Sequence, residues 1–178
     1  MRLSLVMFAP LFVLPLFGLG FACGRTDRSL LAVGLAAPDV VGKDDKGATQ
    51  RLSDQKGRYA IVYFYPKDDT PGCTREACAF RDAFQRFVEA GVPIYGVSRD
   101  SEASHRAFQD KYKLPFALVA DPSGEVQRAY HVPGTNVAKR VSFLVGPDGK
   151  IARVWPDVDP GVHATDVLDA IAALKRAA

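Results

Sequence analysis

Short apolar runs and longer periodic segments alternate along most of this chain. Five apolar runs have the length of buried strands and are bounded by turn residues: 59–65, 93–98, 116–120, 141–145 and 150–155. Residues 102–112 and 165–175 repeat apolar positions at helical spacing, and 125–130 fits one short helix. The order is strand, helix, strand, helix, strand, then a hairpin and a final helix. This order predicts an α/β protein.

Turn and cap signals mark the boundaries of several of these elements. Ser101 is placed to cap the helix at 102–112, and Gly146-Pro147-Asp148-Gly149 is a strong hairpin turn. Residues 43–47 have the composition of another turn, which leads into a strand at 49–52. No internal repeat or low-complexity tract interrupts the pattern.

The segment with the most specific chemistry joins the strand at 59–65 to a helical pattern that continues to Val88. It reads Pro66-Lys67-Asp68-Asp69-Thr70-Pro71-Gly72-Cys73-Thr74-Arg75-Glu76-Ala77-Cys78. Thr70 is expected at the N-cap and Pro71 at the first helical position, where a missing N–H costs nothing. Cys73 then lies in the first helical turn. Free backbone N–H groups and the helix dipole there favour the thiolate, which is the reactive form of cysteine.

The spacing of Cys73 and Cys78 indicates that a bond between them would be transient. Five residues place them about one and a half turns apart on different faces of a helix. Their Cα atoms would then be roughly 8–9 Å apart, whereas a disulfide seldom spans more than about 7 Å. The pair can bond only if this part of the helix unwinds. A structural disulfide would not be built in this way, but a catalytic one could be.

The pattern Pro66-x-x-x-Thr70-x-x-Cys73 resembles the active-site signature of the peroxiredoxins. The fuller string 63–74 and the spacing of Cys73 and Cys78 are similar to the bacterioferritin comigratory protein, or peroxiredoxin Q, branch. Further matches occur at 37–39, 139–145 and 147–150. The resemblance extends from about 31 to 175. It implies a thioredoxin-like (peroxiredoxin) fold, with a central mixed sheet flanked by helices.

The resemblance also implies a mechanism, a thiol-dependent peroxidase of the atypical two-cysteine type. Cys73 matches the peroxidatic cysteine, which attacks the O–O bond of hydrogen peroxide or an organic hydroperoxide and becomes a sulfenic acid. Cys78 matches the resolving cysteine, which would form the Cys73–Cys78 disulfide. Thr70 would hydrogen-bond the thiolate and the peroxide, Arg140 would supply a fixed positive charge, and Pro66 would shield the pocket from water. No cofactor or metal is implied.

Less specific interpretations compete with these assignments. Cys78 alone could be a core residue, Arg140 could be a solvated residue at a strand start, and Asp68 and Asp69 have the pattern of a solvated acidic pair. The three histidines lack metal-ligand spacing and are expected at the surface or at helix ends: His105, His131 and His163.

Two alternative functions remain open at this point. The first is an exported thiol-disulfide oxidoreductase, although such enzymes carry C-x-x-C and Glu76 stands where the second cysteine would be. The second is a peroxide-sensing tethered module that passes oxidation to a partner. Peroxide turnover with a recycling reductant would separate the peroxidase from the sensor.

The N-terminal residues predict export from the bacterial cytoplasm. Met1-Arg2 precedes an apolar run to Phe21, and small residues at Gly20 and Ala22 are typical of a secretory signal at 1–22. Cleavage after Ala22 would leave Cys23 first, as in a lipoprotein. A soluble cleaved product and an uncleaved anchor are alternatives, and Gly20 departs from the usual lipoprotein pattern. Residues 23–30 would be a tether and 31–178 the domain.

Charge and compartment limit the partners. The formal net charge is +3, with acidic and basic residues well mixed, so nothing indicates nucleic-acid binding. We expect a monomer, tethered to a membrane or free in the periplasm, that binds a hydroperoxide and a thioredoxin-like reductant. Disulfides persist outside the cytoplasm, so such a reductant would have to be supplied there.

Overall fold

Seven strands form one mixed sheet in a computed structural model that describes residues 29–177. Across the sheet their order is β2-β1-β5-β4-β3-β6-β7. The strands are β1 (Val41–Lys43), β2 (Thr49–Arg51), β3 (Ala60–Phe64), β4 (Ile94–Ser98), β5 (Ala117–Ala120), β6 (Val141–Val145) and β7 (Ile151–Trp155). The helices are α1 (Pro71–Asp82), α2 (Phe84–Ala90), α3 (Glu102–Tyr112), α4 (Glu125–Ala129) and α5 (His163–Ala177), with a 3-10 helix η1 (Leu52–Gln55).

The centre of the sheet is parallel and its edges are antiparallel. Strand β4 pairs in parallel with β3 and β5, with Tyr63 opposite Gly96 and Gly96 opposite Leu118. Strand β6 runs antiparallel to β3, and β7 runs antiparallel to β6. Every residue of β3, β4 and β6 is buried, because helices and loops cover both faces of the sheet. This burial explains why these strands appear in the sequence as unbroken apolar runs.

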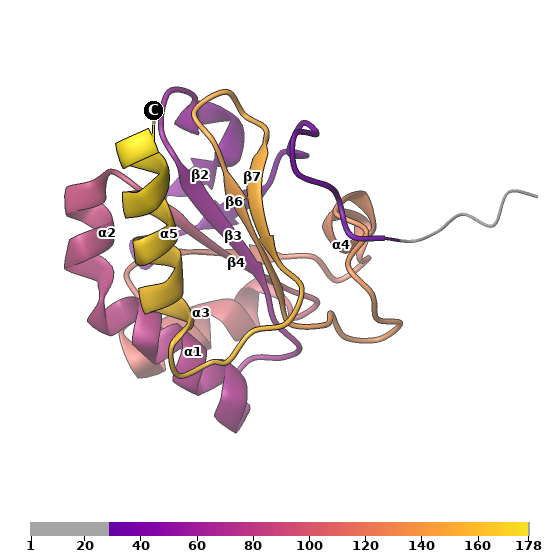
Figure 1. Ribbon diagram of the computed structural model, residues 1–178. Helices are drawn as coiled ribbons and strands as arrows, with labels where there is room; N and C mark the ends of the chain where they lie inside the picture. The colour runs from indigo at the N-terminus through magenta and orange to yellow at the C-terminus, as the bar shows by residue number, and fades with distance from the viewer. Residues whose placement is uncertain (1–28, 178) are drawn as a thin grey trace, which may run out of the picture.

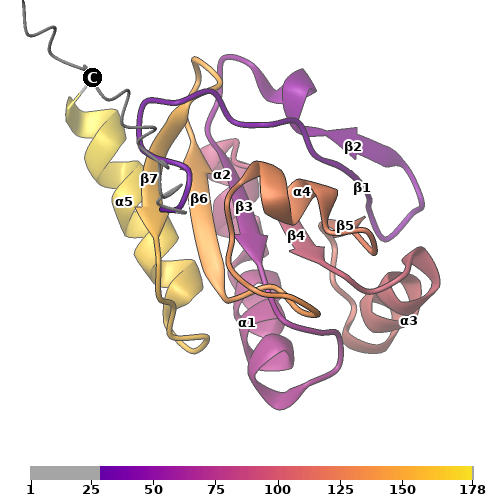
Figure 2. The same cartoon turned by 90° about the vertical axis from the view of Figure 1, so that its right-hand side faces the viewer.

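Successive residues of β3 divide the core into two layers. Ile61 and Tyr63 pack in one cluster with apolar residues of α1, α2, α3 and α5, whereas Val62 and Phe64 pack in a second cluster on the other face. Figure 1 shows α1, α2 and α5 together on one side of the sheet. In Figure 2, α4 and the segment before β1 cover the opposite side. The α1–α5 side holds Cys73 within its apolar cluster.

Most predicted elements lie where the sequence pattern places them, with two differences. The helical pattern from Cys73 to Val88 forms two helices, because Ala83 (φ −90°, ψ 1°) leaves the helical conformation between α1 and α2. Strand β1 and η1 were not predicted. The central mixed sheet flanked by helices is confirmed. The predicted signal at 1–22, Cys23 and most of the tether at 23–30 lie outside the described residues.

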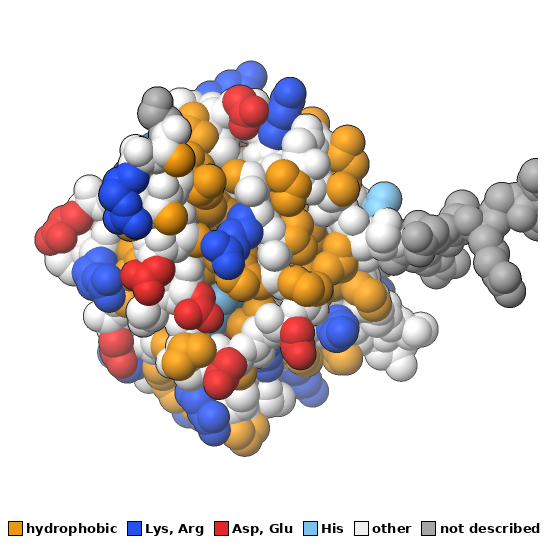
Figure 3. Space-filling model, viewed as in Figure 1, with side chains coloured by type: hydrophobic (Ala, Val, Ile, Leu, Met, Phe, Trp, Pro, Cys, Tyr) orange, Lys and Arg blue, Asp and Glu red, His pale blue; other side chains and the backbone are white. Residues whose placement is uncertain are grey.

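Two properties of the described part bear on its partners. Within residues 29–177, no helix has both the length and the apolar character needed to cross a membrane. On the face shown in Figure 3, basic and acidic side chains are interspersed, and neither sign forms a continuous surface. That face therefore lacks the basic patch typical of a nucleic-acid site.

Candidate active site

The start of α1 presents Cys73 as the sequence predicts. Thr70 precedes a proline and is held extended (φ −88°, ψ 151°), so it occupies the N-cap, and Pro71 is the first helical residue. The first backbone bond of the helix runs from Thr74 N to Thr70 O at 2.8 Å. The N–H groups of Gly72 and Cys73 are therefore left without helical acceptors. Cys73 is only 2% exposed, so its sulfur lies at the positive end of the helix and away from bulk water.

Arg140, just before β6, brings a fixed positive charge to this sulfur. Its Nη2 atom lies 3.3 Å from Cys73 Sγ, and its Nη1 atom donates to Glu76 Oε2. Burial alone would lower the pKa of Arg140. The charge of Glu76 and the contact with Cys73 raise this pKa by more than burial lowers it, so the net shift is upward. The guanidinium therefore stays charged. A Cβ atom at Gly72 would lie 3.3 Å from Arg140 Nη2, so the absence of a side chain there leaves room for the contact.

Glu76 and His163 are members of the site that sequence reasoning missed. Glu76 is fully buried, and its Oε1 atom lies 2.8 Å from His163 Nδ1, at the first residue of α5. The spacing of three between Cys73 and Glu76 could have placed both on one face of the helix. For His163 the sequence carried no local signal, because its contact joins residues 87 positions apart. His163 lies at a helix end, one of the two places expected for it, and it is buried there.

The other two predicted site residues lie close to α1 with different contacts from those expected. The Thr70 hydroxyl donates to Lys67 O at 3.0 Å, and among the described residues no hydrogen bond joins it to Cys73. The single proton of this hydroxyl is thus donated within the turn before the helix and not to Cys73. The Thr70 oxygen also accepts no N-cap hydrogen bond. Pro66 is half-buried directly after Tyr65. The roles assigned to Thr70 and Pro66 in catalysis stay predictions.

Cys78 lies further along the same unbroken helix. It is partly exposed, and both it and Cys73 are free thiols in this structure. Residues 73–78 are helical throughout, so the two cysteines occupy the arrangement in which they cannot bond without unwinding. The structure thus corresponds to the dithiol form of the protein.

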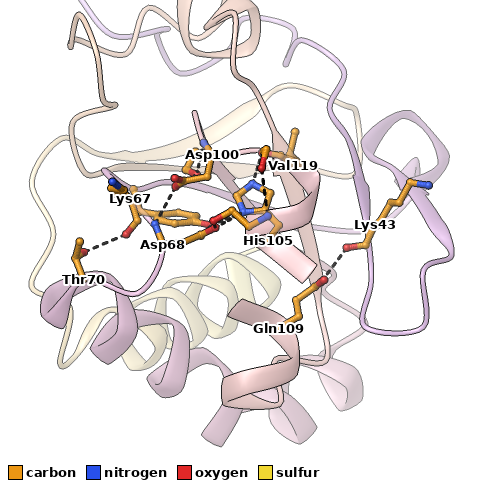
Figure 4. Close-up of polar contacts among 12 residues, drawn as sticks. Lys43, Lys67, Asp68, Thr70, Asp100, His105, Gln109 and Val119 are labelled. Carbon is orange, nitrogen blue, oxygen red and sulfur yellow. Dashed lines mark hydrogen bonds and ion pairs between the residues drawn. The ribbon is translucent and has the colours of Figure 1, made fainter. Parts of the chain in front are cut away.

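The acidic pair in the preceding loop is not simply solvated, as the sequence suggested. Asp68 is buried, and its carboxylate accepts hydrogen bonds from the Tyr65 hydroxyl and from Ser104 Oγ, both at 2.7 Å. His105 Nδ1 lies 2.9 Å from the same carboxylate, and His105 Nε2 lies 3.2 Å from Val119 O. Figure 4 shows Asp68 and His105 facing each other between the loop and α3. His105, expected at the surface or at a helix end, lies in the first turn of α3 but is buried, and its contact with Asp68 attaches this loop to the helix.

Asp69 makes a second connection to the same helix. Its carboxylate lies 2.6 Å from Lys111 Nζ and accepts a hydrogen bond of 2.5 Å from the Tyr112 hydroxyl. Asp69 also has a positive φ of 57°, which turns the chain toward Thr70. The two aspartates therefore attach the loop to both ends of α3, and the start of α1 is positioned by that attachment. His131 is exposed, as expected.

The pKa of Asp68 reflects these contacts. Burial raises the pKa of the carboxyl, but the hydrogen bond and charge of His105 and the hydrogen bonds from Ser104 and Tyr65 lower it more, and the net shift is downward. Burial and the neighbouring Tyr63 and Asp68 raise the pKa of Tyr65 well above its usual value, so its hydroxyl remains a donor. The loop before Cys73 is thus held by the charged Asp68 carboxylate, both of whose oxygens have hydrogen-bond partners.

A thiol at the first turn of a helix, next to a mixed sheet of this order, places the protein in the class of thiol redox proteins with a thioredoxin-like fold. The chain belongs to the AhpC/TSA family, whose sequence pattern matches residues 33–154. The putative peroxiredoxin bcp of Coxiella burnetii is 41% identical over 149 residues, which cover 78% of this chain and 97% of that protein. Peroxiredoxin Bcp of Bacillus subtilis is 40% identical over 149 residues, covering 79% and 95%.

Solved structures agree with these relatives. The bacterioferritin comigratory protein of Xanthomonas campestris aligns with a TM-score of 0.72 at 34% identity, over 80% of this chain and 96% of that one. A mutant of PrxQ from Xylella fastidiosa aligns with a TM-score of 0.76 at 29% identity, over 83% and 99%. The resemblance to the bacterioferritin comigratory protein branch and the thioredoxin-like fold are both confirmed.

Proposed function

We propose that this protein is a thiol-dependent peroxidase that reduces hydrogen peroxide and organic hydroperoxides through Cys73 and Cys78. The observation that carries the proposal is the contact of 3.3 Å between Arg140 Nη2 and the buried Cys73 Sγ at the start of α1. This arrangement brings a cysteine sulfur, a cation and free N–H donors together at one point. The relatives that carry peroxiredoxin names support the same activity.

The first step needs only groups that the site contains. The Cys73 thiolate attacks one oxygen of the hydroperoxide, a new S–O bond forms, and the O–O bond breaks. The sulfur is oxidised by two electrons to a sulfenic acid, and the leaving oxygen takes up, through solvent, the proton that the Cys73 thiol released on ionising, to become water or an alcohol. Arg140 and the free N–H groups at the start of α1 stabilise the negative charge that develops on that oxygen.

The second step uses Cys78. Its sulfur attacks the sulfur of the Cys73 sulfenic acid, an S–S bond forms, and the S–O bond breaks. Hydroxide leaves and takes the thiol proton as water. A dithiol reductant of the thioredoxin type then restores both thiols by disulfide exchange and is itself oxidised. Because α1 is helical from 71 to 82 before this step, its first part has to unwind to let Cys78 approach.

The test is the intact mass of the reduced full-length protein before and after one equivalent of hydrogen peroxide. We expect the loss of two hydrogens, mapped by peptide analysis to Cys73 and Cys78. Cys73→Ser should abolish peroxide consumption, whereas Cys78→Ser should keep the first oxidation and accumulate sulfenic or over-oxidised Cys73. Cys23→Ser is the matched control and should behave like the unsubstituted protein. Small and equal losses from the first two substitutions would contradict the assigned roles.

The substrate panel should include alkyl hydroperoxides as well as hydrogen peroxide. The structure of the Xanthomonas campestris protein is described in terms of its alkyl peroxide reduction activity. Continued turnover with an added thioredoxin-like reductant distinguishes a peroxidase from a peroxide sensor. A sensor would be oxidised once and would transfer the oxidation to a partner without sustained peroxide loss.

We further propose that the protein works outside the cytoplasm, held at a membrane through Cys23. The apolar run after Met1-Arg2 and the position of Cys23 support this location. Cell fractionation with a lipid label should find the label on the native chain and lose it in Cys23→Ser. A cytoplasmic, unprocessed protein would overturn the proposal. If the exported protein stays oxidised at rest, the proposed supply of reductant in that compartment is wrong.

A further inference from the structure

His163 is a buried polar group to which the peroxidase steps assign no role. It is 1% exposed and opens α5, beyond the segment 33–154 that matches the family pattern. Its ring packs edge-on against Phe80 and Trp155, with ring centroids 5.0 and 6.0 Å apart. Nδ1 lies 2.8 Å from Glu76 Oε1, whereas Nε2 has no hydrogen-bond partner within the described residues.

The contact with Glu76 determines which nitrogen of the His163 ring carries a proton. Glu76 also accepts from the Arg140 guanidinium, and an ionised carboxylate can only accept, so His163 Nδ1 carries a proton and donates it. A buried nitrogen without a partner, such as Nε2, lowers stability, and an apolar side chain of similar volume would avoid this loss. Packing therefore does not explain a histidine at this position. The one polar contact that the ring makes leads to Glu76.

We propose that His163 is a positioning residue that acts on both half-reactions through Glu76. Its hydrogen bond fixes the Glu76 carboxylate, the carboxylate fixes the Arg140 guanidinium, and the guanidinium lies against Cys73 Sγ. The same bond attaches the first turns of α1 to α5. This inference rests on the proposed peroxidase function and adds to it a control over the order of its steps.

The position of Glu76 between the two cysteines gives the proposal its specific consequence. Cys78 reaches Cys73 only when the helix between them unwinds, and that movement takes Glu76 away from Arg140 and His163. The His163 bond therefore favours the helical state that reacts with peroxide and opposes the unwound state that forms the disulfide. Removing the bond should slow the first step and accelerate the second. General destabilisation does not predict this pair of opposite changes.

Three substitutions separate hydrogen bonding from packing. His163→Leu keeps an apolar volume and removes the donor. His163→Asn places an amide nitrogen on Cγ, where the ring has Nδ1, and His163→Gln carries the same group one carbon further out. We expect His163→Asn to behave like the native protein and His163→Gln to behave like His163→Leu. The comparison of His163→Asn with His163→Gln remains informative even if His163→Leu does not fold, which thermal unfolding of each reduced variant will show.

The experiment uses the full-length chain with Cys23→Ser, so that only Cys73 and Cys78 remain. Rapid mixing with hydrogen peroxide, quenching with a thiol alkylator and mass analysis give the rate of each step, and Cys78→Ser isolates the first. We expect His163→Leu to lower the first rate constant about tenfold, in proportion to a lost hydrogen bond to a charged group. Disulfide formation should become severalfold faster, and less sulfinic acid should accumulate at high peroxide.

Several results would overturn the proposal. The variants His163→Leu, His163→Asn and His163→Gln could all react at the native rates. Alternatively, Cys73 oxidation and disulfide formation could both slow in proportion to the loss of thermal stability. The effect of His163→Leu on the first step could also persist unchanged when Glu76→Gln is already present, which would show that it bypasses Glu76. If the unsubstituted protein is not oxidised by peroxide at all, the proposed function itself is wrong. Normal oxidation with indistinguishable variants would overturn only the role of His163.

Discussion

Arg140 divides one guanidinium between a sulfur and a carboxylate. Its two terminal nitrogens face different partners, Nη2 toward Cys73 and Nη1 toward Glu76, and its side chain is 16% exposed. Because the planar group is fixed by Glu76, it would not have to reorganise in the proposed first step, when charge moves from the sulfur to the leaving oxygen. A lysine could supply the charge but not two donors in this fixed geometry.

Arg140→Lys should therefore slow the reaction with peroxide although the charge is retained. We expect the rate constant for Cys73 oxidation to fall by about 10²-fold, the usual effect of losing one well-placed donor. Rapid mixing with hydrogen peroxide in the Cys78→Ser background measures it. Arg128→Lys, an exposed arginine of α4, is the matched control and should be neutral. An unchanged rate in Arg140→Lys would mean that charge alone is sufficient.

Among the individual residues of the site, the sequence predicts some and not others. Cys73 and Arg140 are found because a local motif and a second matched string contain them. Glu76 is a polar residue inside a helix, and only the fold shows that its face is buried. His163 approaches it from α5, and a contact across 87 residues leaves no pattern in either segment.

The loop before α1 is positioned by α3. Asp68 binds near the start of that helix through Ser104 and His105, and Asp69 binds at its end through Lys111 and Tyr112. The two contacts differ in strength. Asp68 is buried, whereas Asp69 is exposed, so solvent weakens its ion pair with Lys111. We expect most of the stabilisation to come from Asp68.

Asp68→Asn should reduce stability and change its dependence on pH. The pKa of this carboxyl is lowered in the folded protein, so the unfolded chain binds more protons near and below its ordinary value of about 3.9. The stabilisation is complete above that value and is lost as pH falls through the lower, folded value. We expect a loss of about 1–3 kcal/mol near neutral pH, the effect of a disrupted buried hydrogen-bond network.

Denaturant unfolding from neutral pH to below pH ~4 measures this effect, since the variant should show a flatter decline in acid. Asp110→Asn, an exposed aspartate on α3, is the matched control and should keep the native profile. Parallel profiles for Asp68→Asn and the native protein would remove Asp68 as the source of the acid sensitivity.

Elements are predicted well where their pattern is long and apolar. The boundaries of α3 and the Ser101 cap agree with the sequence, and Ser101 Oγ accepts from Ser104 N at 3.2 Å. The break between α1 and α2 was missed because the apolar spacing continues across Ala83 while the backbone does not. Strand β1 has only three residues, too few for a recognisable alternation.

At the scale of the whole molecule, both cysteines lie on α1, which shares one side of the sheet with α5. Cys73, Ala77 and Phe80 of α1 pack in the same core cluster as Ala164 and Val167 of α5. Formation of the proposed Cys73–Cys78 disulfide would disturb the first two of these residues and leave Phe80 beyond the unwound part. The sheet can therefore remain intact while one corner of the core opens.

The oxidised protein should be less stable than the reduced protein. A crosslink across so short a loop contributes about 2 kcal/mol by restricting the unfolded chain. Moving Glu76 away from Arg140 and His163 lowers the free energy of unfolding by about 3–5 kcal/mol, the usual effect of breaking a buried ion pair. The loss exceeds the gain, so thermal unfolding should occur at lower temperature after oxidation by one equivalent of peroxide. A higher unfolding temperature for the disulfide form would show that α1 stays packed.

The strand order could not be obtained from the sequence in the same way as the elements. The pairing of β1 with β5 depends on Lys43 lying opposite Leu118, and short strands carry too little pattern to specify distant partners. The order of elements predicted an α/β protein and the family resemblance predicted the thioredoxin-like fold, whereas the strand order β2-β1-β5-β4-β3-β6-β7 became known only from the structure.

The unbroken helix from Pro71 to Asp82 also limits how this protein can adapt to heat. A lineage that moves to a warmer habitat usually gains stability through many small changes, including better helix-forming residues. In α1 such changes would hold Cys78 away from Cys73 and leave the oxidised sulfur exposed to a second peroxide. Selection for thermal tolerance should therefore act on the other helices and on the hairpins, and α1 should stay able to unwind as the proposed cycle requires.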